Sequence, residues 1–212
     1  MDKMAVRFTI NKNGILEKAV LTDEAGVIIT DSVRGVGERE FYDYSNLSNV
    51  TIPDGVTDIG AGAFASCDWL SYVEIPDSVT CISDKAFYDC YSLTSVTIPD
   101  SVTSIGADAF ADCNTLVSVV ISGNLTNIGE RAFAWCESLT EVVIPKSMAS
   151  ISERAFYACS SLVSVTIPDG VMNIGSDAFM NCGADLVIRT PAGSYAERYA
   201  IENDIKFESV NM

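Results

Sequence analysis

The segment that decides the fold is LTSVTIPDSVTSIGADAFADC, residues 93–113, because its pattern recurs with a period of 23 residues. The full unit reads L-x-x-V-x-I-P-D-x-V-x-x-I-G-x-x-A-F-x-x-C-x-x. Its last fixed column is a cysteine, found at Cys67, Cys90, Cys113, Cys136, Cys159 and Cys182, and a phenylalanine stands three residues before each of them. Chance cannot place several such columns in one register, so the chain is a repeat array.

The array has clear boundaries. Its six clear units span 47–69, 70–92, 93–115, 116–138, 139–161 and 162–185. A degenerate unit at 24–46 precedes them, because Val27, Ile29 and Phe41 fit its columns. The array therefore covers residues 24–185, with an N-terminal segment 1–23 and a C-terminal segment 186–212 outside it.

Each unit predicts one coil of a solenoid. The V-x-I part alternates apolar and polar residues and predicts a short strand, which the following proline ends because it lacks an N–H donor. The V-x-x-I-G part predicts a second extended segment, and A-F-x-x-C predicts one turn of helix. A single unit cannot bury its own apolar residues, so the strands stack in parallel and like side chains form ladders. The predicted fold class is an α/β-type repeat solenoid, a leucine-rich repeat of about seven 23-residue coils with short parallel strands and short helical turns.

Both ends of the solenoid need a cap, because an open coil exposes its core and a strand edge. Residues 1–23 predict a hairpin around Asn13 and Gly14, the preferred pair of a type I′ turn. In 186–212, Thr190 and Pro191 predict the N-cap and first residue of a helix. This helical cap would run to about Asn203 and be closed by a strand at 205–207. One helical face would carry Tyr195, Ala196, Tyr199 and Ala200.

Composition excludes several classes of function. The 212 residues include 13 basic and 29 acidic side chains, a net charge of -16, which argues against nucleic acid and anionic membranes as partners. The absence of histidine excludes Ser-His-Asp and Cys-His catalysis and His-ligated zinc. No motif for catalysis or phosphate binding is present. We therefore expect no enzyme, no catalytic residues and no cofactor.

The acidity is concentrated in one part of the array. Residues 47–115 hold 1 basic and 10 acidic side chains, whereas residues 116–161 hold 3 and 4. A basic partner is therefore expected to dock toward the N-terminal coils.

The predicted binding surface is the outward face of the strands, here called the strand face. Its residues alternate with the buried ladders and are mostly uncharged. They are Asn49, Thr51, Tyr72, Glu74, Ser95, Thr97, Ser118, Val120, Glu141, Val143, Ser164 and Thr166. Solenoid proteins commonly bind partners on such surfaces, although hydroxyl and β-branched residues also simply suit strands.

Two columns of polar residues have alternative interpretations. The cysteine column favours buried reduced thiols, but adjacent rungs about 5 Å apart also permit disulfides. Cys81 lies outside the column and is expected to be exposed, either as an incidental thiol or as an intermolecular link. The aspartate column favours turn capping through each residue's own backbone, with calcium binding as the alternative; it consists of Asp54, Asp77, Asp100 and Asp169. No metal site is predicted.

Large aromatic residues outside the ladders flank the cysteine column. They are Trp69, Tyr88, Tyr91, Trp135 and Tyr157. Packing between coils is the favoured role, and a contact patch for carbohydrate or protein is the alternative.

The repeated ladder, as in residues 93–113, resembles the BspA-like class of leucine-rich repeats. The ending TPAGSYAERYAIENDIKF, residues 190–207, resembles the C-terminal cap of bacterial members. The resemblance implies a non-catalytic protein–protein interaction module of the adhesion type, on the cell surface or secreted, with a host matrix or surface protein as partner. A carbohydrate-binding module and an intracellular scaffold are the alternatives.

The location and assembly of the protein are less constrained. No apolar run of signal-peptide or membrane-span length occurs in the chain, so no membrane insertion is expected. The same absence makes a cytoplasmic location the alternative to the surface. The sequence indicates no oligomeric state.

Overall fold

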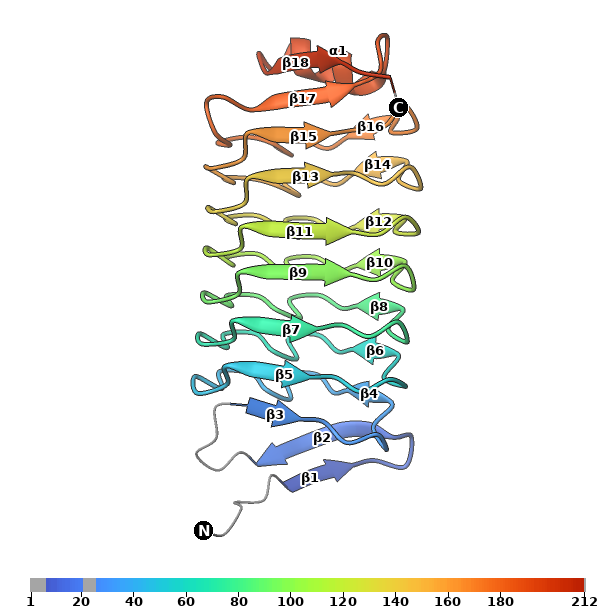
Figure 1. Cartoon of the computed structure of the whole chain (residues 1–212), viewed down its shortest axis with the longest axis vertical. Coiled ribbons are helices and arrows are strands. Elements are labelled where there is room, and N and C mark those ends of the chain that lie inside the picture. Colours follow the sequence, from blue (N-terminus) through green and yellow to red (C-terminus); the bar gives the residue numbers. More distant parts are fainter. Residues whose placement is uncertain (1–6, 21–25, 212) are drawn as a thin grey trace.

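The computed structural model of the protein describes residues 7–20 and 26–211. The fold is a parallel β-solenoid of about 8 turns, where the sequence predicts about seven. The coils stack along the long axis of the molecule (Figure 1). The additional turn includes the C-terminal segment, in which Ile188 pairs with Val165 at the spacing of one repeat.

Both extended segments predicted for each unit are present. The longer strands are β3 (Gly26–Ile28), β5 (Asn49–Thr51), β7 (Tyr72–Glu74), β9 (Ser95–Ile98), β11 (Ser118–Ile121), β13 (Glu141–Val143), β15 (Ser164–Thr166) and β17 (Val187–Thr190). The shorter strands are β4 (Gly35–Val36), β6 (Asp58–Ile59), β8 (Cys81–Ile82), β10 (Ser104–Ile105), β12 (Asn127–Ile128), β14 (Ser150–Ile151) and β16 (Asn173–Ile174). Pairing of Val27 with Val50 shows that the degenerate unit keeps the register of the others.

Neither column of strands is one continuous sheet. The longer strands divide into β3-β5-β7 and β9-β11-β13-β15-β17-β18, and the shorter ones divide after β12. The two interruptions lie at different coils. The boundary between β7 and β9 is still bridged by pairing of β8 with β10, and the boundary between β12 and β14 by pairing of β11 with β13.

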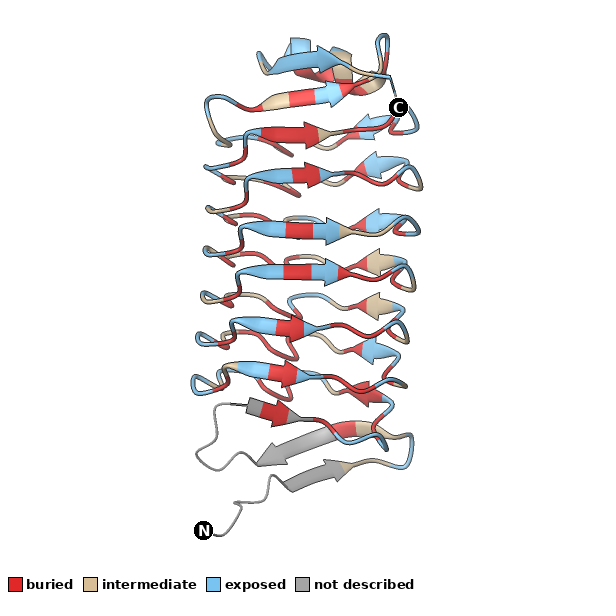
Figure 2. Cartoon of the chain, viewed as in Figure 1, coloured by how far each residue is buried: buried red, intermediate tan, exposed pale blue. Residues whose placement is uncertain are grey.

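The core is a set of side-chain ladders that run the length of the solenoid. Phenylalanine rings of successive coils stack almost in parallel, from Phe41 on Phe64 at 5.0 Å between centroids to Phe156 on Phe179 at 5.5 Å. This spacing follows from the distance between neighbouring strands. Figure 2 shows the resulting alternation along β5, β7, β9, β11 and β13, with a buried residue between exposed ones.

The A-F-x-x-C segment forms consecutive turns, so the predicted turn of helix in each repeat is wrong. In the coil 70–92, Lys85 and Asp89 have φ of 58° and 64°, in the left-handed region that an α-helix excludes. The N–H of Lys85 therefore points sideways and donates to Ala107 of the next coil, at 2.8 Å, and the N–H of Asp89 donates to Ala111 in the same way. The repeats are β-coils joined by turns, which corrects the α/β-type fold class.

The N-terminal segment contains the predicted hairpin, formed by β1 (Arg7–Ile10) and β2 (Ile15–Val20). Its turn is not type I′, because among the loop residues Gly14 has a positive φ, of 78°, and Asn13 does not. Instead the side-chain Oδ1 of Asn11 accepts hydrogen bonds from the N–H groups of Asn13 and Ile15, at 2.9 and 3.0 Å. This is a three-residue loop with glycine in the left-handed position.

The C-terminal segment contains one short helix, α1 (Tyr195–Glu202), followed by strand β18 (Lys206–Ser209), which lies parallel to β17. The helix begins later than predicted, because Ser194 is its N-cap and Thr190 is the last residue of β17. The hydroxyl of Thr190 instead shares a hydrogen bond of 2.8 Å with that of Ser194. The helical part of the predicted cap is therefore limited to these eight residues.

The helix α1 presents its small and aromatic residues to the core. Ala196, Tyr199 and Ala200 are buried, and Tyr195 is half-buried against them. Among the residues that the structure describes, no helix is long and apolar enough to cross a bilayer.

Candidate binding surfaces

The strand face is largely exposed as predicted. Of its twelve residues, all ten from Asn49 to Val143 are exposed to solvent. Tyr72, Val120 and Val143 each expose just over half of their surface, which places an aromatic ring and two aliphatic side chains in water. The row forms a regular surface across β5, β7, β9, β11 and β13 (Figure 2).

The last two predicted residues do not belong to the exposed surface. Ser164 is buried, with 8% of its surface exposed, and Thr166 is half-buried. Ser164 pairs with Glu141 on one side and Val187 on the other, and these longer side chains cover the short serine. The usable strand face therefore ends at β13.

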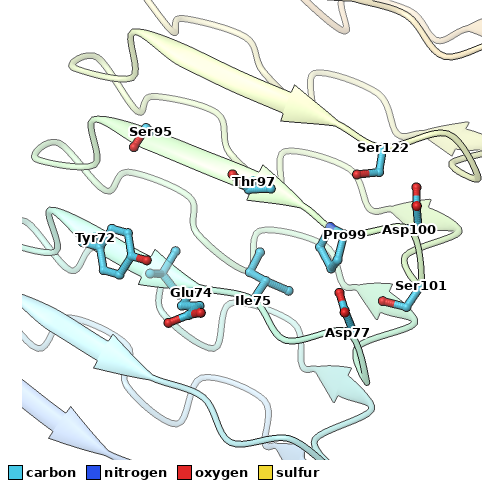
Figure 3. A pocket seen from close by; sticks show the side chains of 11 residues that line it. Tyr72, Glu74, Ile75, Asp77, Ser95, Thr97, Pro99, Asp100, Ser101 and Ser122 are labelled. Carbon is cyan, nitrogen blue, oxygen red and sulfur yellow. The ribbon is translucent and has the colours of Figure 1, made fainter.

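A groove of about 680 Å³ crosses the strand face where the sheet is interrupted between β7 and β9. Figure 3 shows Tyr72 and Glu74 on β7 facing Ser95 and Thr97 on β9, with acidic side chains from the following turns at the other end. Its lining includes three carboxylates, those of Glu74, Asp77 and Asp100, and no basic residue. The groove was not predicted, because the sequence pattern continues unchanged through the interruption.

Two of the groove carboxylates, Asp77 and Asp100, lie in the turns that follow β7 and β9, whereas Glu74 belongs to β7. Asp100 Oδ1 accepts a hydrogen bond of 2.9 Å from the N–H of Gly123, one repeat later. Asp100 therefore holds the next coil, which differs from the predicted bond to its own backbone. In the described part of the chain, no group of three or more His, Cys, Asp or Glu side chains could hold a metal ion.

The cysteine column consists of free thiols. Five are buried, and each thiol of the column donates to the carbonyl of a phenylalanine in the preceding coil, as Cys67 Sγ does to Phe41 at 3.0 Å. Burial raises the pKa of Cys67 to about 12. The last rung, Cys182, is half-buried, and a hydrogen bond with Cys159 lowers its pKa.

Cys81, outside the column, is half-buried rather than exposed. The hydroxyl of Ser104 on the neighbouring strand β10 donates to its sulfur, at 3.4 Å. Cys81 thus takes part in the ladder of β8 and β10.

The aromatic residues outside the ladders divide into two groups. Trp135 packs edge-on against Tyr157 of the next coil, with centroids 5.4 Å apart. In contrast, Trp69 exposes 65% of its surface and Tyr91 exposes 45%, so these two do not pack between coils. Packing between coils therefore explains Trp135 and Tyr157 only, since Trp69 and Tyr91 are open to solvent and Tyr88 is half-buried.

Comparison with known proteins agrees with this architecture. Residues 24–139 and 126–212 match the model of the BspA type leucine-rich repeat region. A leucine-rich repeat protein of T. pallidum has a similar solved structure, with a TM-score of 0.78 and 25% identity over 100% of this chain and 99% of that one. A leucine-rich repeat protein from Bacteroides capillosus is 30% identical, with a TM-score of 0.49, over 56% of this chain and 94% of that one. No curated protein matches the sequence. The chain belongs to the family of BspA type leucine-rich repeat proteins.

Proposed function

We propose that this protein is a non-catalytic interaction module that holds a protein partner on its strand face, centred on the groove between β7 and β9. The groove itself is the observation that carries the proposal. It combines one exposed aromatic ring, four serine or threonine hydroxyls and three carboxylates within about 680 Å³. Aromatic rings in desolvated contacts and complementary charges are the features that give protein interfaces their affinity and specificity.

The charge of the groove defines the chemistry of the partner. Apart from Ser122, all residues that line the groove lie within residues 47–115, which hold 10 acidic and 1 basic side chains. A partner segment with exposed lysine or arginine would be attracted to it, and added salt would weaken this attraction. The two sides of the groove are also preorganised, because β7 pairs with β5 and β9 pairs with β11, so little order must be gained on binding.

We further propose an adhesion role at the cell surface or in secreted form, with a host matrix or surface protein as partner. The family resemblance supports this part of the proposal. An intracellular scaffold is the competing function, and it would bind through the same face. Localising the native protein in its cell with an antibody against residues 47–185 distinguishes the two.

The test of the strand face is a binding panel of purified extracellular-matrix proteins, measured by biolayer interferometry. Thr97→Arg and Tyr72→Arg each put a positive charge into the groove at an exposed position, and each should weaken binding by ~10-fold or more. Met172→Arg, at an exposed residue outside the groove, is the control and should bind as the wild type does. Full affinity of both groove variants contradicts the strand-face proposal, and a panel without any binder contradicts the adhesion role.

A further inference from the structure

One coil lacks a row of large side chains on its A-F-x-x-C turns. In the coil 47–69 the four positions between the fixed glycine, alanine, phenylalanine and cysteine columns are occupied by Ala61, Gly62, Ala65 and Ser66, of which Gly62 and Ala65 are buried and the other two half-buried. In each of the other six units at least one of these positions carries a charged residue, a tyrosine or another large side chain. The coil is therefore locally thin between two full-sized neighbours.

The neighbouring coils form two walls of similar chemistry around this gap, here called the tyrosine slot. The coil 24–46 contributes Glu38, Arg39 and Tyr42, and the coil 70–92 contributes the corresponding Asp84, Lys85 and Tyr88. The slot has a volume of about 500 Å³, within the range of small-molecule sites. No residue lines both the slot and the groove of the strand face.

Gly62 is not required by the backbone of this turn. Its φ is 60°, but the corresponding residues Arg39 and Lys85 adopt 55° and 58° with full side chains. A Cβ at Gly62 would lie 3.3 Å from Cγ of Arg39. Glycine here therefore widens the slot.

The width of the slot suits one ring. The phenylalanine rings of the same three coils are 5.0 and 5.2 Å apart, so the two walls are separated by about 10 Å. A six-membered ring placed midway would lie ~5 Å from each wall, which is within the contact range of stacked rings.

The charges of the slot balance. Arg39 lies over the ring of Tyr42, at 4.4 Å from its centroid, and Lys85 lies 5.8 Å from that of Tyr88. One wall supplies the carboxylate of Glu38 with its cation, and the other wall supplies the carboxylate of Asp84 with its cation. Alanine methyl groups form the floor between them. Such a site has no net charge and offers apolar contacts together with donors and acceptors.

We propose that the tyrosine slot binds a neutral saccharide, with one pyranose ring held between Tyr42 and Tyr88. A pyranose presents C–H faces that fit aromatic and methyl surfaces, and hydroxyl edges that both donate and accept hydrogen bonds. The carboxylates and cations of the walls bond those edges. A charged ligand would be repelled by either the two carboxylates or the two cations of the walls. A neutral polyol is not repelled, because its hydroxyls donate to the carboxylates and accept from the cations.

The test fills the slot with the residue that the neighbouring coils already carry. Ala65→Tyr restores the row, and the turn tolerates it because Tyr42 and Tyr88 occupy the same position one coil away on either side. Ala134→Tyr makes the same exchange three coils away and is the matched control. The probes are neutral oligosaccharides of glucose, galactose, mannose and N-acetylglucosamine on a glycan panel, with the best binder measured by isothermal titration calorimetry.

The expected result is binding of a neutral oligosaccharide that Ala65→Tyr weakens at least tenfold and Ala134→Tyr leaves unchanged, with equal melting temperatures for all three proteins. Tyr88→Ala, which removes one wall without filling the slot, should also weaken binding. The proposal is overturned by a panel without binders or by an affinity of Ala65→Tyr equal to that of the wild type. Unchanged sugar binding by Thr97→Arg would show that this site is independent of the strand face.

Discussion

The phenylalanine ladder offers a direct measure of how the coils hold one another. Phe110 has no exposed surface, and its ring stacks on Phe87 at 5.1 Å and on Phe133 at 5.3 Å. Phe110→Ala removes both contacts and leaves a cavity that the flanking rings cannot fill, because the strand spacing fixes their positions. We expect a loss of about 4 kcal/mol in the free energy of unfolding, within the range for buried phenylalanine truncations.

The assay is urea denaturation followed by circular dichroism, with midpoint and slope fitted for each variant. Phe110→Leu keeps most of the volume and should cost about 1–2 kcal/mol. Phe179, which has a phenylalanine on one side and Tyr199 edge-on at 6.2 Å on the other, should lose less than Phe110 on truncation. A loss below ~2 kcal/mol for Phe110→Ala at an unchanged slope would refute the ladder as the main source of cohesion. A lower slope would instead show that the array unfolds in separate blocks.

Four further predictions concern the other columns of the repeat. Alkylation of the native protein should modify Cys81 and Cys182 first, because the other thiols are buried, and fast loss of all seven thiols would contradict the buried column. Gly106→Ala should cost about 2 kcal/mol, because a Cβ there overlaps the backbone of the preceding coil. Gly123→Ala should be near neutral in the same denaturation assay, because its Cβ would meet only Asp100 Oδ1, at 3.9 Å. Asp100→Ala should lose about 1 kcal/mol with its inter-coil hydrogen bond. Calcium should leave the melting temperature of the wild type unchanged, and a calcium-dependent increase would instead support metal binding by the aspartate column.

The strands and their register follow from the sequence, because a period of 23 residues and an alternation of two leave one way to stack the units. The turns do not follow in the same way. Lys85 adopts a left-handed backbone conformation that a lysine side chain does not favour, and a hydrogen bond to the next coil holds it there. A pattern within one unit cannot show a conformation that depends on its neighbour.

The candidate surfaces likewise combine features that one repeat unit predicts with features that depend on the neighbouring units. Exposure of the strand face from Asn49 to Val143 follows from alternation, but burial of Ser164 depends on the longer side chains that flank it. The groove arises where β7 and β9 do not pair, which no residue type indicates. The tyrosine slot did have a sequence signal, since reading the columns across units shows the small residues Gly62 and Ala65 between larger ones.

The staggered interruptions of the two strand columns also bear on how the molecule responds to a pulling force. At the coil boundaries after β7 and after β12, only one of the two strand columns is paired, whereas both are paired at the adjacent coil boundaries. Tension along the axis would therefore separate the stack at these two boundaries first, into three blocks. Each coil that then peels away releases 23 residues, about 80 Å of extended chain, in place of ~5 Å of folded height. Such a molecule lengthens in steps under load, and the groove lies at one of the two places where the first step begins.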